Sequence, residues 1–249
     1  MRTSHTRQNF SERELMRVLD LFSGIGGFSL GLERAGMRTV AFCEIDPFCR
    51  RVLAKHWPDV PCYGDIRTLP HVGCDIIAGG FPCQPWSVAG KRRGAQDDRH
   101  LWPEMFETIM RERPAWVIGE NVTGFSLMGL DNALDDLESV GYEARTFVIP
   151  ACAVGAPHRR DRIWIVAYAE RGESRQESHN GAPRRMGGKL ESLAWDRDWQ
   201  DALREFRGVD DGLSYGVDRT DSIRNSVVPQ VVEVIGRAIM RAAENVKGR

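Results

Sequence analysis

The chain has 249 residues, with 34 Lys and Arg against 35 Asp and Glu, so its formal net charge is −1. This balance excludes a polybasic protein of the histone or membrane-surface type. A hydrophobic fraction of 42% beside 28% charged residues excludes intrinsic disorder over the whole chain. At about 150 residues per domain, the length predicts one large domain with a small appendage.

Residues 1–17 are expected to form an N-terminal extension. They carry charges where a secretory signal would have an apolar run, which argues against export. No stretch approaches about 20 uncharged apolar residues, so we expect no membrane span. The six cysteines form no C-x-x-C pair and have no companion His at zinc-ligand spacing. We therefore expect no metal site and mostly reduced thiols.

Between residues 18 and 167, short apolar strands alternate with helical periodicity. Helices are predicted from the glycine-rich turn to Gly36, from Asp46-Pro47 onward, and near 100–112 and 130–140. The strands are predicted at 18–22, 39–43, 74–78, 115–119, 143–149 and 162–167. This alternation predicts an α/β fold of Rossmann-like type, with a mostly parallel sheet and helices on both faces.

The amino-acid composition changes after Ala167. Residues 168–216 have few aliphatic runs and many charged, Ser and Gly residues, which indicates a surface insert or a small irregular module. Apolar periodicity returns from Val227, and residues 217–249 are expected to end in an amphipathic helix that packs back on the sheet.

Glycines and acids follow the first strands at the positions of a nucleotide site. Gly24, Gly26 and Gly27 lie at the first strand-to-helix turn, where open parallel sheets bind ligands. Glu44 follows Gly24 by 20 residues, the spacing of a ribose-binding carboxylate, and Asp65 stands in Gly64-Asp65-Ile66 before the next apolar run. Serine replaces the third glycine of the dinucleotide fingerprint. The pattern predicts an adenosine-containing cofactor without a pyrophosphate; the alternative is a tight turn with solvated acids.

A cysteine and a carboxyl group follow the next two strands. Cys83 stands between Pro82 and Pro85, where it is either a nucleophile or a small buried residue. Glu120 directly follows an apolar strand, as a helix-capping acid or as a carboxyl with a raised pKa that can donate a proton. Strand alternation directs Arg160 and Arg162 to one side, where they are either solvated or hold substrate oxygens.

These motifs, in order DLFSGIGG, CEIDP, GDI, GGFPCQPWS, GENV and GAPHRRDR, with RNSVVPQ near the C-terminus, resemble those of the cytosine-5 DNA methyltransferases. The resemblance covers residues 18–167 and 217–242. It implies a class I S-adenosylmethionine-dependent methyltransferase with a seven-stranded, mostly parallel sheet. It also implies a catalytic and cofactor-binding core at 18–167, a short target-recognition segment at 168–216, and a C-terminal motif and helix at 217–249.

The resemblance also assigns residues. Cys83 is similar to the family nucleophile that adds to C6 of a flipped-out cytosine in duplex DNA. Glu120 would contact N3 and the exocyclic amine, and Arg162 would steady the base with Arg160 close by. S-adenosylmethionine would contact Phe22, Gly24, Gly26, Gly27, Glu44, Ile45, Asp65, Ile66, Pro82, Asn225 and Ser226. DNA contacts are expected from Ser87, Lys91, Arg92, Arg93, Arg175, Arg184 and Arg185.

Three departures from the family pattern keep alternatives open. His158 stands where the family usually has Gln. Arg224 stands where the family usually has Gly, and arginine would be strained there if the position needs a positive φ. Only 57 residues separate Ala167 from Asn225, where the family usually inserts a considerably larger target-recognition domain. The leading hypothesis is an active DNA methyltransferase of a restriction-modification system or phage genome. It would act as a monomer in the cytoplasm of a prokaryotic cell or phage-infected host, with a cognate restriction endonuclease as a candidate partner. The alternatives are a catalytically impaired DNA-binding relative and an RNA cytosine methyltransferase; a nicotinamide dehydrogenase fits worst.

Overall fold

The computed structural model describes residues 15–82, 101–127, 129–156, 159–169 and 226–247. The described helices are α1 (Gly27–Arg34), α2 (Pro47–His56), α3 (Trp102–Glu112), α4 (Leu130–Ser139) and α7 (Pro229–Lys247). Short 3-10 turns are η1 (Ile66–Thr68), η4 (Thr123–Leu127) and η5 (Ala151–Val154). The strands are β1 (Arg17–Leu21), β2 (Arg38–Cys43), β3 (Cys62–Tyr63), β4 (Ile76–Gly80), β5 (Trp116–Val122), β6 (Tyr142–Pro150) and β7 (Asp161–Ala169).

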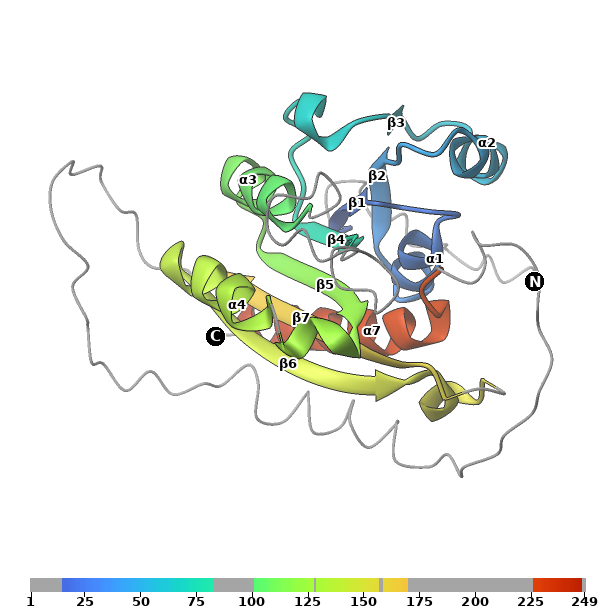
Figure 1. Cartoon of the computed structure of the whole chain (residues 1–249). Helices are drawn as coiled ribbons and strands as arrows, with labels where there is room; N and C mark the ends of the chain where they lie inside the picture. Colours follow the sequence, from blue (N-terminus) through green and yellow to red (C-terminus); the bar gives the residue numbers. More distant parts are fainter. Residues whose placement is uncertain (1–14, 83–100, 128, 157–158, 170–225, 248–249) are drawn as a thin grey trace, which may run out of the picture.

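The strands form one seven-stranded sheet in the order β3-β2-β1-β4-β5-β7-β6 (Figure 1). β7 runs antiparallel to β5 and β6, and the other neighbouring pairs are parallel. The predicted α/β class with a mostly parallel sheet is therefore confirmed. The chain order reverses between β1 and β4, and a crevice for ligands forms at such a switch point.

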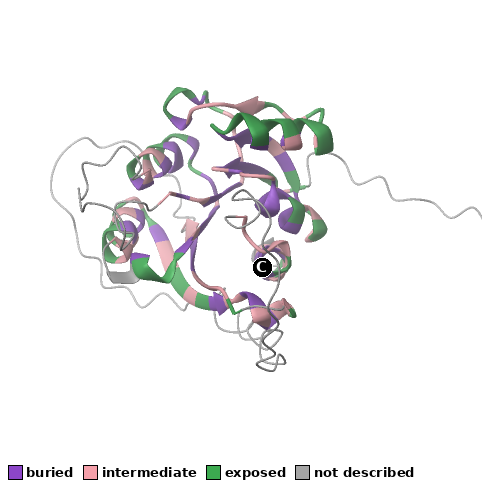
Figure 2. Cartoon of the chain, turned by 45° about the vertical axis from the view of Figure 1, so that its right-hand side comes forward, coloured by how far each residue is buried: buried purple, intermediate pink, exposed green. Residues whose placement is uncertain are grey.

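The two faces of the sheet are covered by different helices. Val18 and Ile76 face the side covered by α1 and α7, whereas their neighbours Leu19 and Ile77 face α3 and α4. Side chains that alternate in this way, with both sets buried, are typical of a sheet between two helical layers. Figure 2 shows the buried residues concentrated in the central strands and exposed residues on the outer helices. No helix in the described part of the chain is long and apolar enough to cross a membrane.

α7 lies directly against α1. A Cβ atom at Gly31 of α1 would lie 2.5 Å from the carbonyl oxygen of Pro229 and 2.6 Å from the Cβ atom of Val232. At the other end, a Cβ atom at Gly236 of α7 would lie 2.8 Å from the Ala35 side chain. The absence of side chains at these two glycines allows the helices to approach this closely. Through this contact, apolar residues of α7 join the core on that face of the sheet.

Strand positions follow the sequence prediction, but several boundaries differ. β4 begins two residues later than predicted and continues through Gly79 and Gly80, which pair with Leu21 and Glu120 of the neighbouring strands. β5 extends to Val122, because Glu120 and the residues after it pair with β7. The first predicted strand ends one residue early, at Leu21, since Phe22 has φ 52°. The sequence reasoning missed β3, which has only two residues.

Candidate cofactor and active site

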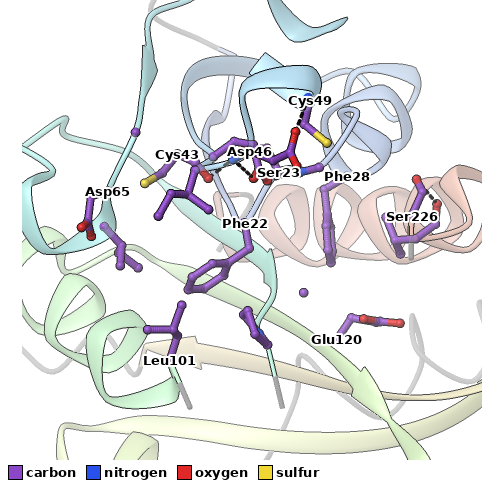
Figure 3. A pocket seen from close by; sticks show the side chains of 18 of the residues that line it. Phe22, Ser23, Phe28, Cys43, Asp46, Cys49, Asp65, Leu101, Glu120 and Ser226 are labelled. Carbon is purple, nitrogen blue, oxygen red and sulfur yellow. Dashed lines mark hydrogen bonds between the residues drawn. The ribbon is translucent and has the colours of Figure 1, made fainter. Parts of the chain in front are cut away.

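A cavity of about 410 Å³ opens at the carboxyl ends of the central parallel strands. Pockets for small molecules commonly have about 300–1,000 Å³. In Figure 3, Phe22 lies in the middle of the lining residues, with Asp65 on one side and Glu120 and Ser226 on the other. Sequence-predicted site residues that line this cavity are Phe22, Gly24, Glu44, Ile45, Asp65, Ile66, Pro82, Glu120 and Ser226.

Glu44 holds the glycine turn to the beginning of α2. Its buried carboxylate accepts a hydrogen bond from the Gly24 amide (2.7 Å) and another from the Asp46 amide (2.8 Å). Asp46 in turn caps α2 by accepting from the amides of Phe48 and Cys49, as its position before a proline predicts. Each carboxylate oxygen keeps capacity for a further donor, such as a hydroxyl group in the cavity.

Asp20 supports the N-terminus of α1 from beneath the turn. The helix begins after Gly26, which has no side chain to cap it. The fully buried Asp20 carboxylate accepts instead from the amide (3.1 Å) and the hydroxyl (2.7 Å) of Ser29. Burial raises the pKa of Asp20 to about 7, although the hydrogen bonds from Ser29 oppose that rise. Its Oδ1 atom has no hydrogen-bond partner among the described residues.

Gly26 and Gly27 lie behind the cavity wall. Gly26 has φ 89°, and a Cβ atom there would lie 2.6 Å from the Trp57 ring. A Cβ atom at Gly27 would lie 2.8 Å from Val227, whose backbone returns from the C-terminal part of the chain. Trp57 is fixed in this place because its indole N–H donates to the Glu33 carboxylate (2.9 Å). The sequence reasoning missed Trp57; its one signal is a large aromatic residue directly after α2.

The cavity combines apolar and polar walls. Phe22 projects into it from a left-handed backbone conformation, which is strained for a non-glycine residue. Ile45, which is 73% exposed, contributes an apolar side chain to the same wall. Asp65 caps η1 by accepting from the Arg67 amide (3.0 Å), and its carboxylate also lines the cavity.

Glu120 and Arg162 form an ion pair on two adjacent strands. Arg162 Nε lies 2.9 Å from Glu120 Oε1, and the side chains are 23% and 12% exposed. Burial raises the pKa of Glu120, while the charges of Arg162 and Arg160 lower it. Burial likewise lowers the pKa of Arg160, and the charge of Arg162 adds to that effect. For Glu120, the effect of burial exceeds that of the two arginines, so its pKa is raised and it takes up a proton more readily than an exposed glutamate does.

Glu120 belongs to two cavities at once. It lines the large cavity and also a much smaller one formed with Arg160, Arg162 and Trp164. Gly80 makes room for it, because a Cβ atom at Gly80 would lie 3.1 Å from Glu120 Oε2. Arg160 reaches the same small cavity from a backbone with φ 38°, so both predicted arginines share one location.

Several cavity residues were missed by the sequence reasoning. Phe28, Leu101 and Val227 contribute apolar wall, and Cys43 contributes a thiol. Burial raises the pKa of Cys43 to about 12, so this thiol stays protonated and is a poor nucleophile. The predicted residues that lie outside the described part of the chain are Cys83, Ser87, Lys91, Arg92, Arg93, Arg175, Arg184, Arg185 and Asn225, together with the departures His158 and Arg224.

The family model of C-5 cytosine-specific DNA methylases matches residues 16–197, which is more than half of the chain. The chain belongs to this family. The type II methyltransferase M2.BsuMI of Bacillus subtilis is 40% identical over 164 residues, which cover 61% of this chain and 42% of the relative. The type II methyltransferase M.HhaI of Haemophilus parahaemolyticus is 32% identical over 163 residues, covering 61% and 49%.

A solved structure extends the likeness of this methylase-family chain to the fold. The Dnmt2 methyltransferase of Schizosaccharomyces pombe superposes with a TM-score of 0.58, covering 93% of this chain and 99% of that one, at 15% identity. This likeness concerns the fold alone. The chain spans less than half the length of these two type II methyltransferases.

Proposed function

We propose that this protein transfers the methyl group of S-adenosylmethionine to C5 of cytosine in duplex DNA. The observation that carries this proposal is the position of Glu120. Its carboxyl group lies on the wall shared by the large cavity and the arginine-lined cavity, paired with Arg162 at 2.9 Å. Pro82 lines the same large cavity and is bonded directly to Cys83, the candidate nucleophile.

The residues of the large cavity fit S-adenosylmethionine. Its adenine would stack on Phe22, its ribose hydroxyls would donate to Glu44, and its exocyclic amine would donate to Asp65. Its carboxylate would meet the N-terminus of α1, where backbone amides and the helix dipole favour an anion. When bound, this cofactor supplies an electrophilic methyl group on a sulfonium. Gly26 and Gly27 would shape the turn, and Asn225 with Ser226 would close the wall from the C-terminal side.

The side chains of this chain would activate the base. The Cys83 thiolate adds to C6 of cytosine, and N3 accepts a proton from Glu120, which makes C5 nucleophilic. C5 would then take the methyl group, with the sulfonium carbon–sulfur bond breaking to leave S-adenosylhomocysteine. Loss of the C5 proton to a base and return of the N3 proton to Glu120 would restore the C5–C6 double bond and expel the Cys83 thiolate. Because C6 is inaccessible inside a duplex, the base must be flipped out, at a cost of a few kcal/mol.

The electrostatics of the Glu120 site support this chemistry. Burial raises the pKa of Glu120, which favours the protonated form needed to donate to N3. Arg162 binds Oε1 and thereby orients the carboxyl group. Arg160, on the same small cavity, lies close enough to lower the pKa of Glu120 through its charge. Together the two arginines would hold the carboxyl group and the flipped base in one geometry.

The remaining assignments rest on sequence and on the relatives. We place target recognition in residues 168–216 and phosphate contacts at Ser87, Lys91, Arg92 and Arg93, with Arg175, Arg184 and Arg185 as further DNA contacts. The relatives are type II methyltransferases, which supports a restriction-modification setting in a bacterial cytoplasm and a cognate endonuclease as partner. We propose that the chain acts as a monomer.

Methyl transfer from tritiated S-adenosylmethionine tests the proposal. The full chain should label duplex DNA but not tRNA, and Cys83→Ala should abolish the labelling. The control is Cys74→Ala, which removes a thiol before the start of β4, at the opposite end of the sheet from the cavity. Equal labelling by wild type and Cys83→Ala would refute the mechanism. Labelling of tRNA alone would indicate the RNA enzyme, and DNA binding without labelling would indicate the impaired relative.

A further inference from the structure

The described residues on either side of the stretch 83–100, which carries Cys83, lie close together in space. Phe81 stands two residues before Cys83, and Trp102 stands two residues after the stretch ends. Their ring centroids lie 5.2 Å apart with an interplanar angle of 56°. Both side chains are buried, with 3% and 4% exposure. The flanks of the Cys83 stretch are therefore in direct contact.

Phe81 is also held by Phe125 of η4 and by Asn121 of β5. Phe125 packs edge-on against Phe81, with centroids 5.1 Å apart and an angle of 77°. The side-chain amide of Asn121, next to Glu120, donates to the carbonyl oxygen of Phe81 (3.1 Å) in a buried position. The carbonyl that leads into Pro82 is thus tied to the strand that bears the candidate proton donor.

A charged hydrogen bond fixes Trp102 from the neighbouring helix. The indole N–H of Trp102 donates to Asp136 Oδ2 of α4 at 2.8 Å. α3 and α4 lie on the same face of the sheet (Figure 1). A phenylalanine would fill the same space, but it has no donor to orient the ring. Hydrogen bonds to an ionised acceptor are stronger and more directional than packing alone. Phe81, Trp102 and Phe125 thus form a cluster of three rings, and Asp136 of α4 is hydrogen-bonded to one of them.

We propose that Trp102 and Asp136 are positioning residues for the step in which Cys83 adds to the base. Neither side chain lines a cavity itself. Trp102 follows Leu101 in the chain and packs against Phe81, which precedes Pro82, and both Leu101 and Pro82 line the large cavity. The geometry of the reacting atoms matters steeply, because a misplacement of about 1 Å can cost about 100-fold in rate. The inference rests on the proposed function, since it assigns a role in that reaction.

The test measures the single-turnover rate at which duplex DNA containing 5-fluorocytosine is trapped covalently at saturating S-adenosylmethionine. Trp102→Phe keeps a ring and removes the donor, and Asp136→Ala removes the acceptor. We expect each to lower the trapping rate about tenfold while the cofactor Kd stays within about twofold. Asp136→Asn keeps an acceptor oxygen and should retain most of the rate. Asp135→Ala, at an exposed carboxylate one position away on α4, should match wild type.

The outcomes separate this inference from the proposed function. Trapping by wild type and by Trp102→Phe at the same rate would overturn the positioning role and leave the proposed function standing. A loss in Trp102→Phe that is matched by weaker cofactor binding would also overturn it, since the hydrogen bond would then merely support the fold. No trapping by wild type would overturn the proposed function and the positioning role together.

Discussion

Replacing Gly31 with alanine should loosen the contact between α1 and α7. The new Cβ atom would lie 2.5 Å from the Pro229 carbonyl oxygen and 2.6 Å from the Val232 Cβ atom, closer than such atoms approach in proteins. Overpacking of this kind costs about 1–3 kcal/mol, and the better helix propensity of alanine returns up to about 1 kcal/mol. We expect a net loss of about 1–2 kcal/mol, because a backbone carbonyl yields less than a side chain.

Thermal unfolding and cofactor titration measure this effect. A loss of that size should lower the Tm by about 2–8 °C in a domain of this length. It should also weaken S-adenosylmethionine binding, because Ser226 and Val227 precede α7 and line the cavity. Gly124→Ala is the matched control: its φ is not positive, and no described atom lies within 4 Å of its new Cβ. A Tm for Gly31→Ala at or above that of Gly124→Ala would refute the reasoning.

Three further changes probe the buried charges and the glycine turn. The folded-state pKa of Asp20 is raised from 3.8 to about 7, so its contribution to stability is lost as the pH rises through that range. Between pH 5 and pH 8, the free energy of unfolding of wild type should fall by about 2–3 kcal/mol relative to that of Asp20→Asn, as measured by urea unfolding. An equal pH dependence of the two unfolding free energies would contradict this. Arg162→Gln removes a charge that lowers the pKa of Glu120, so the alkaline limb of the trapping rate should move to higher pH. An unmoved limb would exclude Glu120 as the titrating donor. Gly26→Ala should weaken cofactor binding more than tenfold by calorimetry, because its Cβ would meet Trp57 at a positive φ; wild-type affinity would show that the turn adapts.

The sequence predicted the sheet well because its strands are buried on both faces. Runs such as Val18 to Leu21 and Trp116 to Ile118 are apolar at every position except the buried Asp20, and helices of clear periodicity separate them. Boundaries were less predictable where glycine or charged residues continue a strand. Gly79 and Glu120 belong to strands only because their neighbours pair with them, and that pairing is a property of the assembled sheet.

For the candidate site, spacing along the chain predicted which residues meet but not what holds them. Glu44 and Asp65 follow strand ends and Glu120 lies near the carboxyl end of β5; because such ends of parallel strands converge, their common cavity could be expected. The contact of Trp57 with Gly26 joins residues 31 positions apart, on elements that no local pattern relates. Asp136, which binds Trp102, is one of several acids on α4, and only packing distinguishes it from the others.

The antiparallel direction of β7 decides where this chain can change in length. β7 starts at Asp161 beside the end of β5 and runs nine residues to Ala169, about 30 Å at about 3.4 Å per residue. It therefore ends at the border of the sheet remote from the cavities, whereas Ser226 resumes the described chain on the cavity wall. Insertions or deletions directly after Ala169 would leave both cavities untouched. We expect related chains to differ in length there, and a foreign domain grafted at that point to leave cofactor binding intact.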